Sequence, residues 1–154
     1  MDLQAFIMQG CMAFCLALTF TPASLPQQQG IEGVARRIMG NRMPSPKYHP
    51  GPSAGTQATI CVFELTNQDQ VTNSGGAGLY SAVHTTLIRQ TDTDDSGHFR
   101  IPLPPGIYSV FTRKGHLFYA TRRDDKNNIA PVEVLPGKMT RVDCSVESDH
   151  TAVY

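Results

Sequence analysis

The sequence contains no tryptophan, no excess of either charge and no convincing amphipathic helix. Thirteen basic residues balance thirteen acidic residues over 154 positions. A balanced chain has no long-range attraction for the phosphate backbone of nucleic acid or for an anionic membrane surface. We therefore expect no nucleic acid among its partners. The length suits one domain with a core of its own.

One long apolar run lies near the beginning, at residues 5–20 (AFIMQGCMAFCLALTF). It has the length of a signal-peptide core and falls short of the roughly 20 residues that a membrane-spanning helix needs. Small residues follow at 21–23, where a signal peptidase reads the chain. The pattern predicts a signal peptide at 1–23 and one exported domain, periplasmic or extracellular, at 24–154. An uncleaved membrane anchor is the alternative, because the MDLQ start has no basic residue.

Two of the four cysteines, Cys61 and Cys144, lie outside the predicted signal peptide. In an exported protein, two cysteines often form a disulfide. The alternative is that both thiols are buried and pack as small apolar groups. Both interpretations stay open, since a disulfide needs the two Cα atoms within about 7 Å.

Apolar and polar residues alternate in several short runs after the signal, which indicates β-strands. The clear runs are 59–65, 83–90, 99–103, 108–112 and 142–146, and the weaker ones are 31–38 and 130–134. Pro102 lies in the third clear run, which we expect at a sheet edge because proline cannot donate to a ladder. Two longer stretches, 40–55 and 66–78, are predicted loops. About seven strands with close turns predict an all-β, antiparallel Greek-key sandwich.

The stretch DTDDSGHFRIPLPPGIYSVF (92–111) supplies turn residues where the strands require them. Its DDSG segment fits a type I turn that begins at Asp94 and ends at Gly97. The PPG segment fits a type II turn in which Gly106 takes a positive φ. Leu135-Pro136-Gly137-Lys138 repeats that second design before the last strand.

These turns carry a resemblance to a known family. TDDSGHF at 93–99 and LPPGIY at 103–108 resemble the core motif of carboxypeptidase regulatory-like domains, which have the transthyretin-like sandwich. The matching residues are Asp94, Gly97, Phe99, Pro104, Pro105, Gly106 and Tyr108. IEGV at 31–34 is similar to the family's first strand. Over residues 30–147, the resemblance implies a stand-alone accessory or binding module of exported and cell-envelope proteins, without catalytic residues of its own.

Three carboxylates in the same stretch, Asp92, Asp94 and Asp95, are weak candidates for a divalent cation. A calcium loop that starts at Asp92 needs a bidentate Glu at its twelfth position, which holds Leu103. The favoured interpretation is a turn whose Asp and Ser side chains bind local backbone N–H groups. We therefore expect neither a metal nor another cofactor.

No catalytic constellation emerges from the sequence. The histidines, which lack the spacing of a zinc motif, are His49, His84, His98, His116 and His150. Alternation places His84 and His98 on outer faces, there is no GxSxG elbow, and both remaining cysteines fall on presumed core faces. We therefore predict that the protein is not an enzyme.

Two further groups of side chains suggest binding surfaces. The basic pairs 113–114 and 122–123 would bind an anion if the fold gathered them, although a solvated loop rim is the simpler interpretation. Another group, Tyr80, Phe118 and Tyr119, would stack on a sugar if exposed, but such residues more often fill a core.

The sequence thus predicts a non-catalytic exported domain that binds an envelope protein or a glycan through the two long loops, with membrane contact only through a retained N-terminal segment. One alternative is a small metal-dependent or hydrolytic enzyme, which requires His84, His98 or His116 to converge with carboxylates in one cleft. Another is a purely structural envelope protein.

Overall fold

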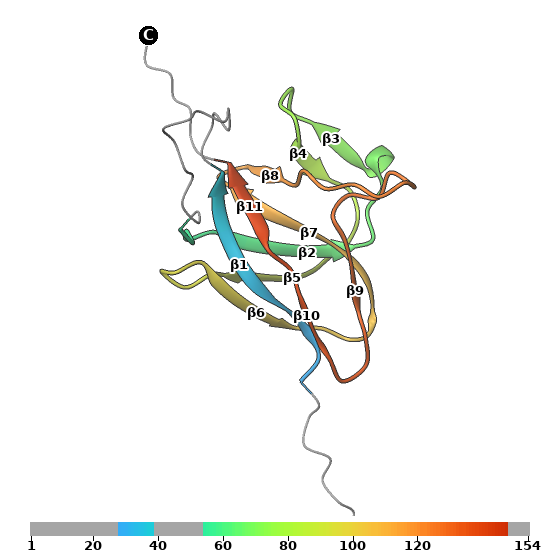
Figure 1. The fold of residues 1–154 in the computed structure, drawn as a ribbon. Coiled ribbons are helices and arrows are strands. Elements are labelled where there is room, and N and C mark those ends of the chain that lie inside the picture. The colour runs from blue at the N-terminus through green and yellow to red at the C-terminus, as the bar shows by residue number, and fades with distance from the viewer. Residues whose placement is uncertain (1–27, 39–53, 148–154) are drawn as a thin grey trace, which may run out of the picture.

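Short alternating strands separated by tight turns build an all-β sandwich (Figure 1), as predicted from the sequence. The computed structural model describes residues 28–38 and 54–147. The described strands are β1 (Gly30–Ile38), β2 (Thr59–Glu64), β3 (Val71–Asn73), β4 (Leu79–Val83), β5 (Leu87–Asp92), β6 (His98–Pro102), β7 (Gly106–Lys114), β8 (Leu117–Tyr119), β9 (Pro131–Val134), β10 (Met139–Arg141) and β11 (Cys144–Glu147), and a short 3-10 helix, η1 (Gln68–Gln70), precedes β3.

Some sequence predictions fall elsewhere in the chain. The signal peptide at 1–23, most of the loop at 40–55, and His49 and His150 lie outside the described residues. No helix in the described part of the chain is long and apolar enough to cross a membrane.

The larger sheet has seven strands and is antiparallel throughout. Its order is β3-β4-β8-β7-β2-β5, and β9 also pairs with β7. The nine-residue β7 accommodates both neighbours on one side, with β9 along residues 106–109 and β8 along 112–114. The long central strand therefore organises the sheet, and β5 and β3 form its two edges.

The smaller sheet is built around β1. Strand β6 pairs antiparallel with one side of β1, and β10 and β11 pair with successive halves of its other side. The latter two pairings are parallel, because the chain returns to β1 from a distant part of the fold and not through a hairpin. Strand β6 lies at the edge, as Pro102 predicts, and Pro102 is the partner of Gly30 at the end of the ladder.

Two hydrophobic clusters stabilise these sheets. The first lies between the sheets and includes Ile31, Ile60 and Ile101. The second lies on the other face of the larger sheet, where the rings of Phe63 and Phe111 meet edge to face at 5.5 Å. Strand β2 therefore buries side chains on both of its faces, which explains its unbroken apolar run ICVF.

The strand predictions were wrong in two respects. The predicted strand 83–90 shares only Val83 with β4, which was otherwise missed, and the chain bends at residues 84–86, so that only residues 87–90 of the prediction lie in a strand, β5. The hydroxyls of Thr85 and Thr66 lie 2.6 Å apart and hold this turn against the end of β2. The predicted loop 66–78 contains η1 and β3, and three-residue strands such as β3, β8 and β10 are too short to show a period of two.

The turn predictions were largely correct. Gly97 has a φ of 80° and donates its N–H to the carbonyl of Asp94 at 2.9 Å. Gly137, at φ 68°, occupies the second predicted type II turn. Gly106, however, is not among the described glycines with a positive φ, so the prediction for the PPG turn was wrong. A Cβ there would lie 3.3 Å from the Tyr108 hydroxyl oxygen, so a larger residue would require this side chain to shift by a few tenths of an ångström.

Candidate functional site

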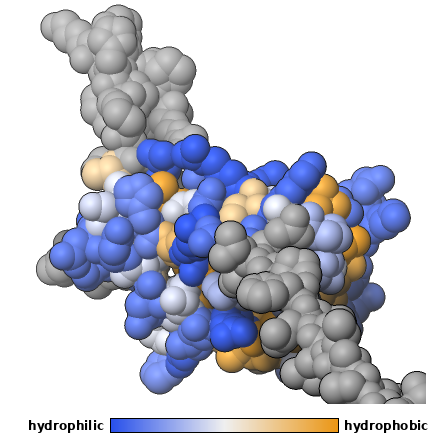
Figure 2. Space-filling model, turned by 90° about the horizontal axis from the view of Figure 1, so that it is seen from below, coloured by the Kyte–Doolittle hydropathy of each residue, from blue (hydrophilic) through white to orange (hydrophobic). Residues whose placement is uncertain are grey.

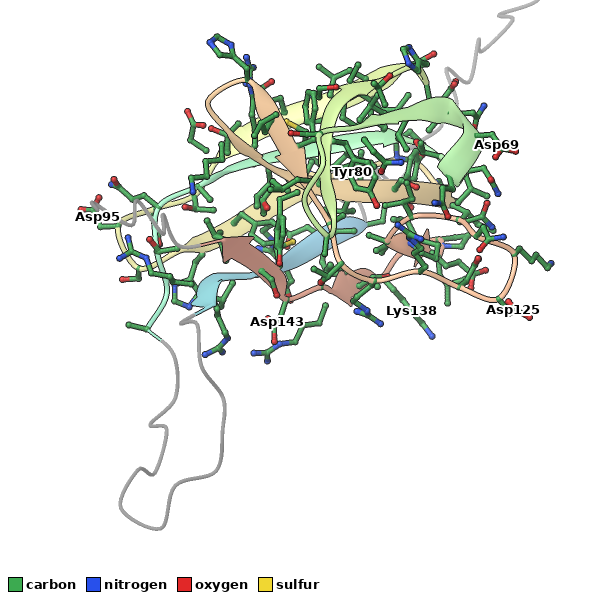
Figure 3. All side chains as sticks on the ribbon, turned by 90° about the horizontal axis from the view of Figure 1, so that it is seen from above. Asp69, Tyr80, Asp95, Asp125, Lys138 and Asp143 are labelled. Atoms are coloured by element: carbon green, nitrogen blue, oxygen red, sulfur yellow. The ribbon has the colours of Figure 1, made fainter. Side chains whose placement is uncertain are left out.

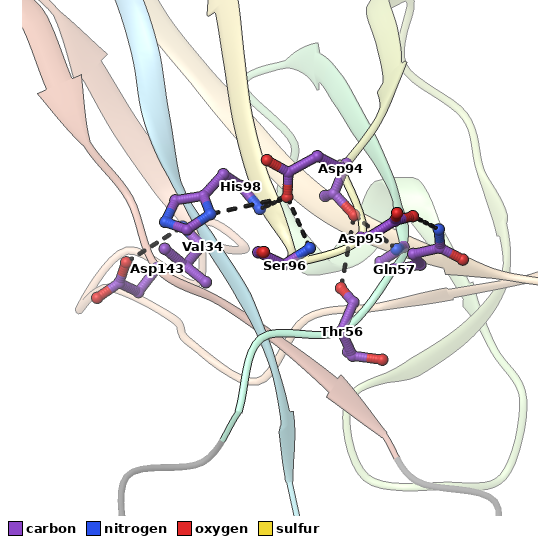
Figure 4. A network of polar contacts seen from close by, with 10 residues as sticks. Val34, Thr56, Gln57, Asp94, Asp95, Ser96, His98 and Asp143 are labelled. Carbon is purple, nitrogen blue, oxygen red and sulfur yellow. Dashed lines mark hydrogen bonds and ion pairs between the residues drawn. The ribbon is translucent and has the colours of Figure 1, made fainter.

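The carboxylates that were weak cation candidates each have separate protein partners, and Figure 4 shows those of Asp94 and Asp95. Asp94 Oδ1 accepts hydrogen bonds from the backbone nitrogens of Ser96 at 2.9 Å and of His98 at 2.8 Å. Asp95 accepts the Gln57 side-chain amide, while Asp92 accepts the hydroxyl of Thr59 at 2.6 Å. Only Asp94 shows the local backbone bonding expected of a turn, whereas Asp92 and Asp95 contact side chains of β2 and of the segment before it. The described residues include no group of three or more His, Cys, Asp or Glu side chains that could hold a metal ion.

The three described histidines are exposed and lie on different elements, in agreement with the outward placement of His84 and His98. His84 Nε2 lies 3.0 Å from the Thr72 hydroxyl oxygen, and His98 Nδ1 lies 3.7 Å from Asp94. His116 occupies the turn between β7 and β8. The convergence that the enzyme alternative requires is therefore not found in the described ranges.

Cys61 and Cys144 are free thiols and pack in different clusters. Cys61 belongs to the cluster around Phe111, and Cys144 packs against the cluster between the sheets. Burial raises the pKa of the Cys61 thiol to about 11 and that of Cys144 to about 12. Both therefore stay protonated at neutral pH, and of the two interpretations left open by the sequence the structure contains the packed thiols.

One arginine of each basic pair has hydrogen-bond partners of its own. Arg123 donates to the Gln68 side chain at 2.9 Å and to the Tyr80 hydroxyl at 3.2 Å, whereas Arg113 donates to the Gly115 carbonyl at 3.1 Å. The sugar-stacking alternative also loses its platform, since Tyr80 and Tyr119 are buried. Figure 3 shows Tyr80 within the body of the sandwich, while acidic residues such as Asp95 and Asp125 project at its margins.

A surface of mixed charge covers the outer side of the smaller sheet. We call it the charged face; its residues are Glu32, Asp94, His98, Arg100, Arg141 and Asp143. Strand register places Glu32 of β1 between Arg100 of β6 and Arg141 of β10. Outward positions on three neighbouring strands thus form one charged row.

Each arginine on this face has a carboxylate neighbour. Arg100 Nε lies 3.4 Å from Glu32 Oε2, and Arg141 Nε lies 3.9 Å from Asp143 Oδ1. Asp143 also accepts the backbone N–H of Val34 at 3.3 Å (Figure 4). Most of these residues border a solvent-open groove of about 480 Å³, a volume typical of ligand sites.

A second surface is apolar and lies at one end of the larger sheet. We call it the apolar end; it comprises the exposed large hydrophobic residues Leu65, Leu87, Ile88, Ile107 and Leu135. Leu65 follows β2, Leu87 begins β5, Ile107 lies at the start of β7, and Leu135 follows β9. Because β2 runs antiparallel to β5 and β7, and β7 to β9, these positions lie at the same end.

The opposite end of the same strands is polar. There Thr59 of β2 pairs with Asp92 of β5 and with Arg113 of β7. Figure 2 looks at the molecule from below and shows apolar groups on the right-hand side and at the lower margin, among hydrophilic neighbours.

Neither surface was identified from the sequence. The alternation in β6 places His98 and Arg100 outward, but nothing in the linear order indicates that Glu32 and Arg141 lie beside them. One residue of the apolar end could have been predicted from the sequence. Ile107 occupies an outer position in an alternating run and is nevertheless apolar, which indicates an exposed hydrophobic side chain.

Comparison with known proteins finds no matching family model, no matching curated protein and no matching solved structure. The similarity to carboxypeptidase regulatory-like domains therefore rests on the motif residues alone and stays a prediction.

Proposed function

We propose that the protein is a non-catalytic, exported binding domain of the cell envelope, and that its apolar end docks a partner protein. The observation that carries this proposal is the distribution of exposed apolar side chains. All five large hydrophobic residues classed as exposed in the described chain lie at one end of one sheet.

Single apolar residues scattered over a surface are normal, whereas a group of them marks an interaction site. Ile107 is 51% exposed and Leu87 is 46% exposed, so both keep much apolar area in contact with water. Removal of such area from water stabilises a complex by about 25 cal/mol per Å² before the costs of association. Leu87 and Ile88 lie at the start of β5, which is an edge strand of the sheet.

Two features of the sequence support the location and the type of protein. The apolar run at 5–20, followed by small residues, supports export. The DDSG and PPG motifs support a carboxypeptidase regulatory-like accessory domain, of which this chain would be a stand-alone form. N-terminal sequencing and intact mass of the exported protein test cleavage after Ala23, and retention of residues 1–23 would contradict it.

The docking proposal is tested with immobilised protein and an envelope extract. The test variant is Leu87→Thr/Ile107→Thr, which keeps strand-forming residues but removes apolar area. The matched control, Arg89→Thr/Arg113→Thr, changes two exposed arginines on the same strands. A protein retained by the wild type is then purified, and its affinity for all three forms is measured by calorimetry.

We expect the control to bind within about twofold of the wild type, and the test variant at least about tenfold more weakly, which corresponds to about 1.4 kcal/mol. Circular dichroism and thermal melting establish that each variant is folded. Equal affinity of the test variant, or the absence of any specific envelope protein, would contradict the proposal.

A further inference from the structure

We infer that the charged face is a second binding site, distinct from the apolar end, and that its ligand is a neutral glycan chain. The first reason is the pairing of its arginines with carboxylates. The arginines of the face each lie beside a carboxylate, Arg100 beside Glu32 and Arg141 beside Asp143. An ion of either sign gains little from groups that are already compensated, because attraction to one partner is offset by repulsion from the other.

The second reason is the match between these pairs and vicinal hydroxyl groups. A guanidinium only donates hydrogen bonds and a carboxylate only accepts them, whereas a hydroxyl does both. A sugar can place one hydroxyl at Arg141 and the next at Asp143. The guanidinium, the carboxylate and both hydroxyls then each have a hydrogen-bond partner. The pair Arg100 and Glu32 repeats this arrangement on the neighbouring strands.

The third reason is the shape and rigidity of the face. The arginines are on β6 and β10, two strand spacings apart, so their backbones are separated by about 9–10 Å. The groove between them is open to solvent, which suits a chain that extends beyond it more than a small enclosed molecule. Backbone N–H groups hold Asp94 and Asp143 in place, which reduces the entropy lost on binding.

A protein partner fits this face less well. Protein interfaces have an apolar core, with charged residues depleted from it. The apolar residue at the centre of the face, Val34, is only 8% exposed. The arginines are the accessible groups, because the side chains of Arg141 and Arg100 are 73% and 55% exposed.

The test uses neutral tetrasaccharides of glucose, galactose, mannose and N-acetylglucosamine on a printed array, with a galacturonate tetramer and polyglutamate as charged probes. Calorimetry on the best neutral probe compares the wild type with Glu32→Ala and Arg141→Ala. The matched controls are Glu64→Ala and Arg89→Ala, which change the same residue types on the larger sheet, where both are exposed. NMR spectra of the full chain locate the bound probe.

We expect a neutral tetramer to bind with an affinity that changes less than about twofold when the salt concentration is raised tenfold. Each test variant should bind about tenfold more weakly, because hydrogen bonds to charged groups are lost. The controls should be unchanged, and shifted amide signals should fall on β1, β6 and β10.

Three results would overturn the inference. Binding of the galacturonate tetramer or polyglutamate alone would mean that the face is an anion site. Failure of every neutral probe, or signal shifts on the larger sheet, would also reject it. The NMR result is independent of the variants, so the inference stays testable if one of them does not fold.

Discussion

The apolar end of the larger sheet and the charged face of the smaller sheet differ in where on their strands they are built. The apolar end consists of exposed residues at or near strand ends, none of which belongs to either hydrophobic cluster. The charged face includes mid-strand positions whose inward neighbours, such as Ile31 and Ile101, fill the core. The apolar surface therefore depends on where strands stop, and the charged surface depends on which strands pair.

This difference also separates the two forms of recognition that we propose. A partner with a complementary apolar surface removes exposed apolar area from water, which is favourable. Compensated charges need a ligand that both donates and accepts hydrogen bonds. The two proposals therefore assign different classes of ligand to the two sheets.

The largest expected effect is a loss of stability at a core residue of β7, compared with a residue of the apolar end on the same strand. Phe111 and Ile107 both lie on β7, but Phe111 is fully buried against Phe63 and Tyr80. Phe111→Ala should lower the free energy of unfolding by about 3–5 kcal/mol. Ile107→Ala should lower it by less than about 1 kcal/mol. Urea denaturation measures both, and a large cost for Ile107→Ala would give the apolar end a structural role.

The next effect concerns the backbone beneath the charged face. An added Cβ at Gly33 would lie 1.8 Å from the Val142 carbonyl oxygen, which is backbone and cannot rotate away. Gly33→Ala should therefore cost about 1–3 kcal/mol in the same measurement. The control is Gly76→Ala, whose Cβ meets only the flexible side chain of Leu79. Equal stability of the two variants would show that β1 can move outward without loss.

Removal of the Asp94 carboxylate should have a smaller effect. Its oxygen accepts two backbone N–H groups, but the side chain is largely exposed, so water replaces part of the loss. We expect Asp94→Ala to cost about 1 kcal/mol and Asp94→Asn, which retains an acceptor oxygen, to cost less. If both variants match the wild type in thermal melting, the turn is held by its backbone alone.

The two buried thiols predict that the stability of the fold depends on pH. An unfolded thiol loses its proton near pH 9.0, whereas Cys61 in the folded protein keeps its proton until about pH 11. The unfolded state is therefore favoured as the pH rises through this window, and stability falls. A Cys61→Ala/Cys144→Ala variant should lose less stability between pH 8 and about 10 than the wild type. Parallel curves from urea denaturation would contradict this expectation.

The smallest expected effect is on the charged face itself. Arg141 is mostly exposed, and exposed ion pairs contribute little to stability. Arg141→Ala should change the free energy of unfolding by less than about 0.5 kcal/mol. A larger loss in urea denaturation would mean that the row of charges holds β10 to β1, and the glycan measurements would then need a milder Arg141→Lys variant.

Local patterns were enough to predict much of the sandwich. The alternation of Phe99, Ile101 and Leu103 correctly placed three side chains in the interior, and the Asp94 to Gly97 turn has the predicted hydrogen bond. Each of these depends on residues close together in the chain. Strands of three residues escaped prediction because they are shorter than the pattern that reveals a strand.

By itself, the sequence determined the class of fold, the position of its main turns and the inward face of its longer strands, because side-chain alternation and turn chemistry act over a few residues. Only the tertiary structure decided that Glu32 lies between Arg100 and Arg141, that Cys61 and Cys144 pack apart, and that Leu87 and Ile107 stay exposed at one end. Strand pairing and the area left in contact with water depend on segments far apart in the chain, and no local pattern records which of them meet.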